Sequence, residues 1–230
     1  MSETPKSDLS ENNGKSIEYR ILTPSNEDLD FFSEILNKSW GSFFNVDEDM
    51  LQERFESNDI FVGAYCNEKP AGILETISIE CDAVENSNPL MPEEKAAFVC
   101  SQIGDYRNLT NSGRWRPVSK NSNVLVFVDV TVSEEYRGTP IASGMIELSK
   151  KLLSKEPRDR MEQLKNIEYA VTFTPNHEPI KRWHEKQYAR DTRFVRKNAR
   201  LGHKLPDVNF MCYMAPGFLA QYGQKEAKKE

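Results

Sequence analysis

Hydrophobic and polar residues alternate in some segments of the chain and recur every three or four positions in others. Residues 17–22 alternate, which predicts a strand with one buried face. Apolar residues then recur at helical spacing after Ser25, and again from about Asp47, which predicts two helices. Residues 60–66 and 71–79 read as strands joined by the turn sequence Asn-Glu-Lys-Pro. The first third is therefore predicted to be β-α-α followed by a β-hairpin.

The second half of the chain continues with alternating strands and helices. Residues 124–132 are nearly all apolar and β-branched, which is typical of a central strand buried on both faces. The predicted elements after it are a helix at 141–153, a strand at 168–174, a helix from Pro175-Asn176 to about Tyr188, and a last strand at 208–214. This order predicts an α+β fold, with a central mixed, mostly antiparallel sheet flanked by helices.

The length of 230 residues suits one domain with additional segments. Only 38% of the residues are hydrophobic, so part of the length is expected to be solvated rather than core. Residues 1–16 are predicted to be a disordered tail, and residues 217–230 a charged C-terminal tail. The domain is predicted at 17–216. Residues 81–123, which break the pattern and include a helix starting near Pro92, are interpreted as an insertion.

No targeting segment and no metal site is expected from the sequence. The chain lacks an 18-residue apolar run and the apolar core of a secretory signal, so we expect a cytoplasmic protein that does not enter membranes. Its four cysteines form no C-x-x-C pair, and it has only three histidines. A structural zinc site is therefore not predicted.

The segment after the strand at 124–132 has the features of an anion-binding loop. Arg137-Gly138-Thr139-Pro140 leads into a helix, whose first backbone N–H groups and dipole favour negative charge. Residues 130–142 resemble the coenzyme A motif of the GNAT acyltransferase superfamily, usually Arg/Gln-x-x-Gly-x-Gly/Ala. Asn176 and the run Ile-Lys-Arg-Trp-His-Glu-Lys-Gln-Tyr resemble the second motif of that family. The resemblance covers roughly residues 17–216, and most members lack the insertion.

This resemblance implies acetyl-CoA as co-substrate and a specific set of binding residues. It places the backbone of Val130 and Val132 beside the pantetheine arm, and Asn176 on the other side of that arm. The residues that it places around the pyrophosphate are Arg137, Gly138, Thr139, Ile141 and Ala142. The alternative is an ordinary strand-to-helix connection with a glycine turn.

Two positions depart from the family pattern. Pro140 replaces the first glycine of the motif, and proline has no N–H to offer a phosphate oxygen. Trp183 stands where many members carry the tyrosine that protonates the departing thiolate, and an indole cannot do so at neutral pH. The run His-Glu-Lys-Gln-Tyr-Ala followed by Asn-Ala-Arg-Leu-Gly is similar to a less common GNAT subgroup with a comparable insertion, in which a histidine follows an aromatic residue. This resemblance implies His184 as the best catalytic candidate, as acid or base. The alternative is a histidine with no role beyond its place on the helix.

Asp129 is the candidate general base. A carboxylate within an apolar strand is costly unless it is satisfied or used, and desolvation moves such a group toward the working range of a base. The alternative is a carboxylate neutralised by a neighbouring backbone group or arginine. Glu75 is the second candidate for the general base.

The charge distribution points to two different partners. Residues 27–59 contain ten acidic residues against Lys38 and Arg54, which favours a cationic acceptor or indicates a solvated acidic face. Residues 181–204 contain nine basic residues against two acidic ones and could hold the 3′-phosphate of coenzyme A or an acidic partner. Nucleic acid is weakly supported, because aromatic residues are sparse there and the overall pI is about 5.3.

The leading hypothesis is an N-acetyltransferase that moves an acetyl group from acetyl-CoA to a primary amine by direct attack in a ternary complex. The acceptor is expected to be a small-molecule amine or a protein amine, and the oligomeric state is left open. Pro140 and Trp183 support an alternative, a GNAT-fold module that binds acyl-CoA or a partner with little or no turnover.

Overall fold

The structure is a computed structural model of the 230-residue chain. It describes residues 10–12, 15–22, 29–40, 48–57, 60–80, 110–111, 114–115, 121–153, 164–167, 169–175, 177–187, 189–196 and 208–214. The helix predicted near Pro92 and the candidate Asn176 lie outside these residues.

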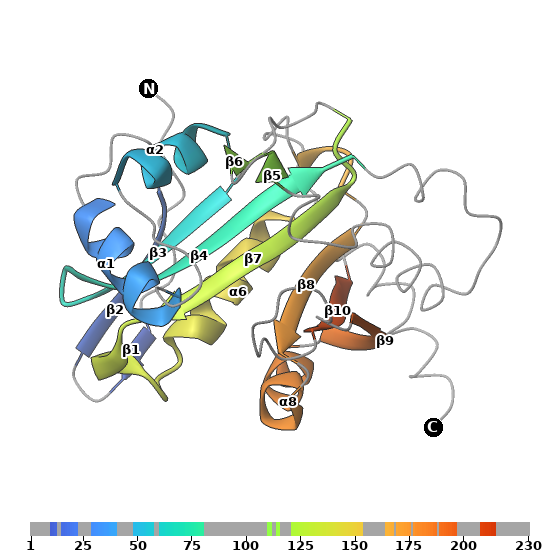
Figure 1. The fold of residues 1–230 in the computed structure, drawn as a ribbon. Helices are drawn as coiled ribbons and strands as arrows, with labels where there is room; N and C mark the ends of the chain where they lie inside the picture. Colours follow the sequence, from blue (N-terminus) through green and yellow to red (C-terminus); the bar gives the residue numbers. More distant parts are fainter. Residues whose placement is uncertain are drawn as a thin grey trace, which may run out of the picture. The chain divides into compact units, whose positions relative to one another are not determined.

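Most of the strands belong to one sheet (Figure 1). Its strands are β1 (Ser10–Asn12), β2 (Lys15–Ile21), β3 (Ile60–Cys66), β4 (Lys69–Ile79), β7 (Val124–Val132), β8 (Tyr169–Pro175), β9 (Ala189–Arg196) and β10 (Val208–Met214). In the described part of the chain they are hydrogen-bonded in the order β1-β2-β3-β4-β7-β8-β10-β9. β5 (Thr110–Asn111) and β6 (Arg114–Trp115) form a separate two-stranded pair.

The sheet is mixed and mostly antiparallel. β1, β2, β3 and β4 pair antiparallel in sequence, and β10 pairs antiparallel with both β8 and β9. Backbone bonds from Asn123 N to Ile79 O (3.0 Å) and from Ser133 N to Ala71 O (2.9 Å) show that β4 and β7 also run antiparallel. β7 and β8 are parallel, with Val124–Phe127 opposite Tyr169–Thr172. The predicted fold class is confirmed.

By their internal contacts, the residues divide into two compact units. Unit 1 comprises Met1–Thr76 and Val128–Lys151, and unit 2 comprises Ile77–Phe127 and Leu152–Glu230. Two of the three boundaries fall inside strands, because β4 is divided after Thr76 and β7 after Phe127. Each of these strands therefore contributes residues to both units.

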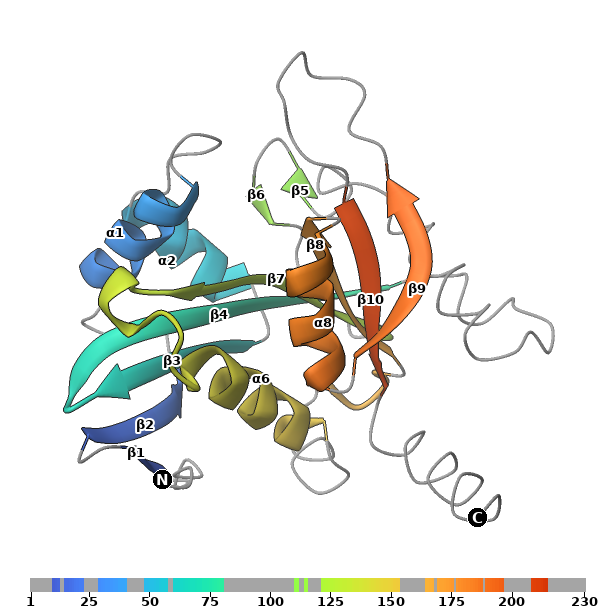
Figure 2. The same ribbon diagram turned by 90° about the horizontal axis from the view of Figure 1, so that it is seen from below.

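In unit 1, helices cover both faces of the sheet (Figure 2). α1 (Leu29–Trp40) and α2 (Glu48–Ser57) lie on one face, where an apolar cluster joins them to β3 and β4. This cluster contains Leu22, Phe32, Ile35, Leu36, Leu51, Phe55, Phe61, Tyr65 and Ile73. α6 (Ile141–Leu152) covers the opposite face, and a Cβ added at Gly72 of β4 would lie 3.2 Å from both Ile141 and Met145.

The glycine within α6 has a packing reason. A Cβ built at Gly144 would lie 2.1 Å from the ring and hydroxyl of Tyr19, which is only 8% exposed. Glycine is unfavourable inside a helix, at a cost of roughly 0.8–1.0 kcal/mol relative to alanine. Here it lets the tyrosine of β2 lie directly against α6.

In unit 2, the helix α8 (Glu178–Lys186) follows β8. Pro179 occupies its first turn, where a missing N–H costs nothing. Lys181 of α8 forms ion pairs with Asp191 of β9 at 2.7 Å and with Glu178 of its own helix at 3.5 Å. These ion pairs connect α8 to β9.

Among the described residues, four strands were missed by the sequence analysis: β1, β9 and the short pair β5 and β6. β1 and the start of β2 occupy part of residues 1–16, which were predicted to be a tail. Strand pairing satisfies the hydrogen bonds of backbone groups without apolar side chains, so amino-acid composition does not predict these strands. The dipeptide Asn13-Gly14 between β1 and β2 is a strong hairpin-turn signal that could have revealed the pair. β9 was interpreted as part of the basic stretch, and β5 and β6 lie in the segment that was interpreted as an insertion.

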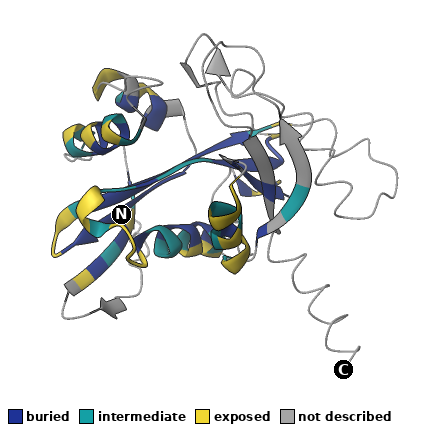
Figure 3. Cartoon of the chain, turned by 60° about the horizontal axis from the view of Figure 1, so that its bottom comes forward, coloured by how far each residue is buried: buried dark blue, intermediate teal, exposed yellow. Residues whose placement is uncertain are grey.

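β7 also differs from the prediction that it is buried on both faces. Val124–Phe127 are fully buried, whereas Val128, Asp129 and Val130 are only half-buried (Figure 3). The change in exposure coincides with the end of the pairing with β8 at Phe127. The second half of β7, which carries the predicted site residues, is therefore the more accessible half.

Candidate functional site

The predicted anion-binding loop lies between β7 and α6 and is tightly folded. A short 3₁₀ helix, η1 (Glu134–Tyr136), follows β7 directly. Backbone bonds from Arg137 N to Glu134 O (3.3 Å) and from Thr139 N to Tyr136 O (3.2 Å) close two successive turns. Gly138 has φ of +79°, and no atom lies within 4 Å of where its Cβ would be. Any other residue there would be strained, so glycine is required by the turn.

The start of α6 offers backbone donors to a ligand. The first α-helical bond runs from Gly144 N to Pro140 O at 2.9 Å. The N–H groups of Ile141, Ala142 and Ser143 therefore precede any acceptor within the helix. This is the arrangement that binds phosphate at helix N-termini.

Not every residue of the predicted motif offers a free polar group. Both donors of Thr139 are directed at Tyr136 O, through the backbone N–H and through Oγ1 at 2.6 Å. Pro140 has no N–H. Arg137 is exposed, which leaves its guanidinium accessible to an anion. The donors that remain for a pyrophosphate come from Arg137, Gly138, Ile141 and Ala142.

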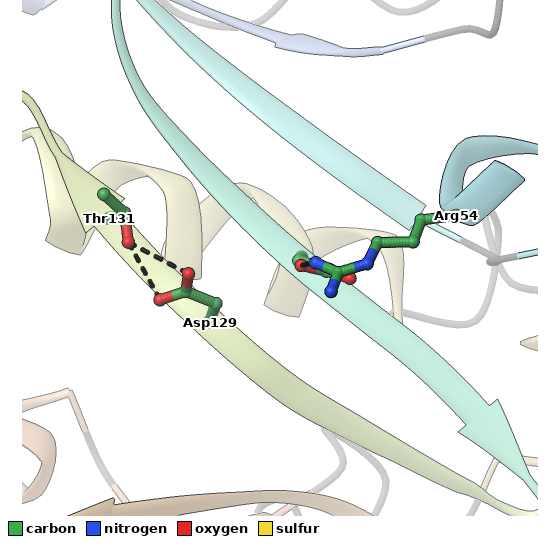
Figure 4. Close-up of polar contacts among 4 residues, drawn as sticks. Arg54, Asp129 and Thr131 are labelled. Atoms are coloured by element: carbon green, nitrogen blue, oxygen red, sulfur yellow. Dashed lines mark hydrogen bonds and ion pairs between the residues drawn. The ribbon is translucent and has the colours of Figure 1, made fainter. Parts of the chain in front are cut away.

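Asp129 of β7 lies beside Thr131, two residues further along the same strand. The hydroxyl Oγ1 of Thr131 is 2.9 Å from Oδ1 of Asp129 and 3.0 Å from Oδ2 (Figure 4). Residues two apart on a strand project from the same face, so this contact is expected of the local geometry. Thr131 is buried, and its hydroxyl donates to the carboxylate of Asp129.

Glu75, the reserve candidate, is engaged in a buried ion pair. Nη1 of Arg54 in α2 donates to Oε2 of Glu75 in β4 at 3.4 Å. The side chains are only 7% and 1% exposed, so solvent screens the pair weakly. Arg54 therefore occupies the position of a permanent counter-ion for Glu75.

The two carboxylates lie on the same face of the sheet. Ala71 and Ser133 are directly opposed in the antiparallel pair of β4 and β7. Alternation then places Glu75 and Asp129 on one face, which is the face covered by α1 and α2. Figure 4 shows Arg54 over β4 and the pair of Asp129 and Thr131 on the neighbouring β7. All four residues belong to unit 1.

His184 lies in α8 of unit 2 and is buried. Burial lowers the pKa of its imidazole to about 4, because desolvation disfavours the charged form. The ring of Trp183 packs edge-on against it, with 4.7 Å between centroids and 72° between planes. His184 is therefore a neutral imidazole at pH 7.

The remaining predicted features are partly covered by the structure. Lys181 and Arg182 of the basic stretch contact acidic neighbours, Asp191 and Glu178. Among the described residues, no group of three or more histidine, cysteine or acidic side chains could hold a metal ion. The described helices include none with the length and apolar composition needed to cross a bilayer.

Two polar residues of the site were missed by the sequence analysis. Thr131 could have been found, because it sits two positions after Asp129 on a predicted strand. Arg54 could not, because its partner is 21 residues away on another element. Only the folded structure brings this arginine to the carboxylate.

Comparison with solved structures identifies the fold. The structure of NAA60 from Arabidopsis thaliana in complex with acetyl-CoA aligns with a TM-score of 0.53 and 18% identity, covering 86% of this chain and 99% of that one. An acetyltransferase of the GNAT family from Streptococcus pneumoniae aligns with a TM-score of 0.54 and 12% identity, covering 86% and 98%. Ard1 from Thermoplasma volcanium aligns with a TM-score of 0.51 and 11% identity, covering 86% and 97%.

These alignments establish the fold of the chain. The chain has the fold of the GNAT acetyltransferases, over almost the full length of the aligned structures. No protein-family model matches the sequence, and no curated protein matches it. The similarity is therefore established at the level of the fold.

Proposed function

We propose that this protein is an N-acetyltransferase that moves an acetyl group from acetyl-CoA to a primary amine by direct attack in a ternary complex. The observation that carries the proposal is the turn at Gly138, which precedes the N–H groups of Ile141 and Ala142 at the start of α6. Within a GNAT fold, this segment follows the strand that ends at Val132.

The cofactor part of the proposal uses donors that the chain presents. The pyrophosphate would accept hydrogen bonds from the backbone of Gly138, Ile141 and Ala142, and Arg137 would supply positive charge. The pantetheine arm would lie along the half-buried part of β7, beside Val130 and Val132. Thr139 would contribute shape rather than donors, because its donors are used within the turn.

The chemistry needs a base for the acceptor ammonium. We assign this role to Asp129, which is half-buried, rather than to Glu75, which is paired with Arg54. Asp129 takes a proton from the ammonium, and the freed nitrogen attacks the thioester carbonyl carbon. The C–N bond forms and the C–S bond breaks. The nitrogen loses its second proton as the amide forms, and the thiolate of coenzyme A takes up that proton.

The catalytic role that the family resemblance implies for His184 is one for a neutral imidazole. With a pKa of about 4, its protonated form amounts to roughly one part in a thousand at pH 7. His184 is therefore poorly suited to donate a proton to the thiolate. Accepting a proton or orienting the leaving group by a hydrogen bond suits a neutral imidazole better.

The acceptor is proposed to be a cationic amine, on a small molecule or on a protein. α1 and α2 expose an acidic surface, and the basic Arg54 is withdrawn from it into the pair with Glu75. The exposed acidic residues of these helices are Asp30, Glu34, Glu48, Asp49 and Glu53. A negative surface of this kind raises the rate of encounter with a positively charged partner.

Calorimetry and an activity assay test the proposal in sequence. Titration with acetyl-CoA should release heat and raise the melting temperature, since a ligand at 100 times Kd stabilises the fold by about 2.7 kcal/mol. Absence of both effects at millimolar ligand would exclude the cofactor site. A thiol-release assay with a panel of primary amines should then show turnover. Asp129→Asn should abolish turnover while sparing the affinity for acetyl-CoA.

The alternative is a module that binds acyl-CoA without turnover. Pro140 removes one donor from the motif, and the low pKa of His184 removes one ready proton source. This alternative predicts heat from acetyl-CoA binding and no thiol release with any amine. The two assays together therefore separate the enzyme from the binding module.

A further inference from the structure

The contact between Thr131 and Asp129 extends the assignment of the general base. The hydroxyl of Thr131 lies within hydrogen-bond distance of both carboxylate oxygens, at 2.9 and 3.0 Å. Thr131 is 4% exposed, so its hydroxyl meets this carboxylate in place of bulk water. A buried hydroxyl that donates to a carboxylate stabilises the charged form of the acid.

Threonine suits this task better than a longer side chain. Its β-branched side chain has few accessible rotamers on a strand, so the direction of the hydroxyl is restricted. Its Cα belongs to the same strand as Asp129, two positions away. The donor and the carboxylate therefore keep their relative positions when neighbouring helices shift.

We propose that Thr131 is a positioning residue for Asp129: its hydroxyl holds the carboxylate in one orientation and keeps it ionised, ready to accept the proton of the acceptor ammonium. This inference rests on the proposed function for its catalytic meaning. The contact between Thr131 and Asp129, and its effect on the Asp129 carboxyl group, do not require a bound substrate.

Other charged groups near Asp129 also influence the ionisation of its carboxyl group. From β4, Glu75 shares the face of the sheet, and from α2, Arg54 pairs with Glu75 at 3.4 Å. The charged residues of α1 are Asp30, Glu34 and Lys38, all exposed to solvent. The charge of Glu75 is compensated locally by Arg54. The hydroxyl of Thr131 is in direct hydrogen-bond contact with Asp129, so its removal should affect that carboxylate.

The test compares Thr131→Val with Thr131→Ser. Valine keeps the branched shape and removes the hydroxyl, whereas serine keeps the hydroxyl and removes the methyl group. The carboxyl carbon of Asp129 is followed by NMR as pH is varied, in protein labelled with ¹³C-aspartate and with the resonance assigned from Asp129→Asn. We expect the pKa of Asp129 to rise by roughly one unit in Thr131→Val and to stay near the wild-type value in Thr131→Ser.

The pH profile of kcat/KM supplies the second measurement. In Thr131→Val, the ascending limb should move to higher pH by about the same amount, while Kd for acetyl-CoA is unchanged. An NMR pKa of Asp129 that is equal in wild type and Thr131→Val would overturn the inference, whatever the activity. If the NMR pKa of Asp129 shifted in Thr131→Val but the ascending limb of the kcat/KM profile did not, the catalytic role of the contact would also be overturned. If the wild type itself releases no thiol, the proposed function fails, and the NMR comparison still decides whether Thr131 tunes Asp129.

Discussion

Arg54 and Glu75 show how one buried pair can constrain the assignment of roles. A buried arginine is tolerated because a carboxylate faces it at 3.4 Å. Glu75 therefore neutralises a buried arginine, which is a structural role. Asp129 on the next strand differs because it is only half-buried. Two acidic residues on one face of a sheet thus acquire different surroundings, which is a common way for two carboxylates to acquire different roles.

Removing the charge of Glu75 should therefore destabilise the fold. In Glu75→Gln, Arg54 stays buried without its counter-ion, and we expect a loss of about 3–5 kcal/mol in the free energy of unfolding, measured by urea denaturation. The double variant Arg54→Met, Glu75→Leu should recover most of this loss, because no uncompensated charge remains. Glu34→Gln, which breaks the exposed pair with Lys38, is the control and should change little. If Glu75→Gln and Glu34→Gln lowered the free energy of unfolding by similar amounts, the buried ion pair would not have the structural role described.

The burial of His184 predicts how stability depends on pH. Its pKa is about 4 in the folded protein, against about 6.5 for an unfolded histidine. Between these values the unfolded chain binds a proton that the folded chain does not. The stability that His184 contributes is therefore complete above pH 6.5 and is lost as pH falls toward 4, by up to about 3 kcal/mol.

Urea denaturation at pH 7.5 and 4.5 measures this loss. His184→Gln cannot titrate and should lose less stability over the same interval than the wild type. His177→Gln, at an exposed position just before α8, is the matched control and should follow the wild-type profile. Parallel profiles for wild type and His184→Gln would show that the imidazole titrates normally.

At the scale of single elements, the packing of α6 on β2 depends on the glycine in the helix. Gly144→Ala would normally stabilise a helix, but its Cβ would lie 2.1 Å from Tyr19. We expect a net loss of about 1–3 kcal/mol from the forced shift of the ring, measured by thermal or urea unfolding. In a Tyr19→Ala background, the same change should become stabilising by about 0.5–1 kcal/mol. Equal effects in both backgrounds would exclude the close approach.

The start of α6 makes a separate prediction about ligand affinity. Pro140→Ala restores a backbone N–H beside the proposed pyrophosphate position, next to the donors of Ile141 and Ala142. A hydrogen bond to a charged acceptor contributes about 1.5 kcal/mol or more, so Kd for acetyl-CoA should fall roughly tenfold. Pro179→Ala, in the first turn of α8, is the control for general effects of removing a proline. Unchanged affinity in Pro140→Ala would show that this N–H does not reach the ligand.

The elements that could be predicted from sequence share a clear physical signal. The limits of β3, β7 and β10 match the predictions, because their apolar and β-branched runs start and stop sharply. β9 was missed because it holds three arginines and an aspartate in eight residues, a composition that reads as solvated chain. Sheet pairing with β10 overrides that local preference.

The candidate site was predictable only in part for the same kind of reason. The loop around Gly138 could be predicted because its glycine and the helix that follows are local features. The ion pair of Arg54 with Glu75 joins α2 to β4, and the low pKa of His184 follows from how deeply α8 buries it. Such properties depend on tertiary packing, which no local pattern encodes.

At the scale of the whole molecule, binding and chemistry can be tested separately. Unit 1 contains the loop, the start of α6, Asp129 and the buried ion pair, whereas His184 belongs to unit 2. The predictions for the loop and for Asp129 therefore do not depend on the role of His184. The shared strands β4 and β7 mean that neither unit is a contiguous stretch of chain.

Hydrogen exchange across the whole chain tests where acetyl-CoA binds. Without ligand, amides in the buried strands, such as those of Val62 and Val126, should exchange slowly. The exposed loop at Gly138 should exchange quickly. When acetyl-CoA is added at 100 times Kd, the N–H groups of Gly138, Ile141 and Ala142 should become roughly 100-fold more protected, because the phosphates accept their hydrogen bonds. The exposed turn at residues 67–68 serves as the internal control and should keep its rate. Protection that spares the loop would place the ligand elsewhere and remove the basis for the proposed cofactor site.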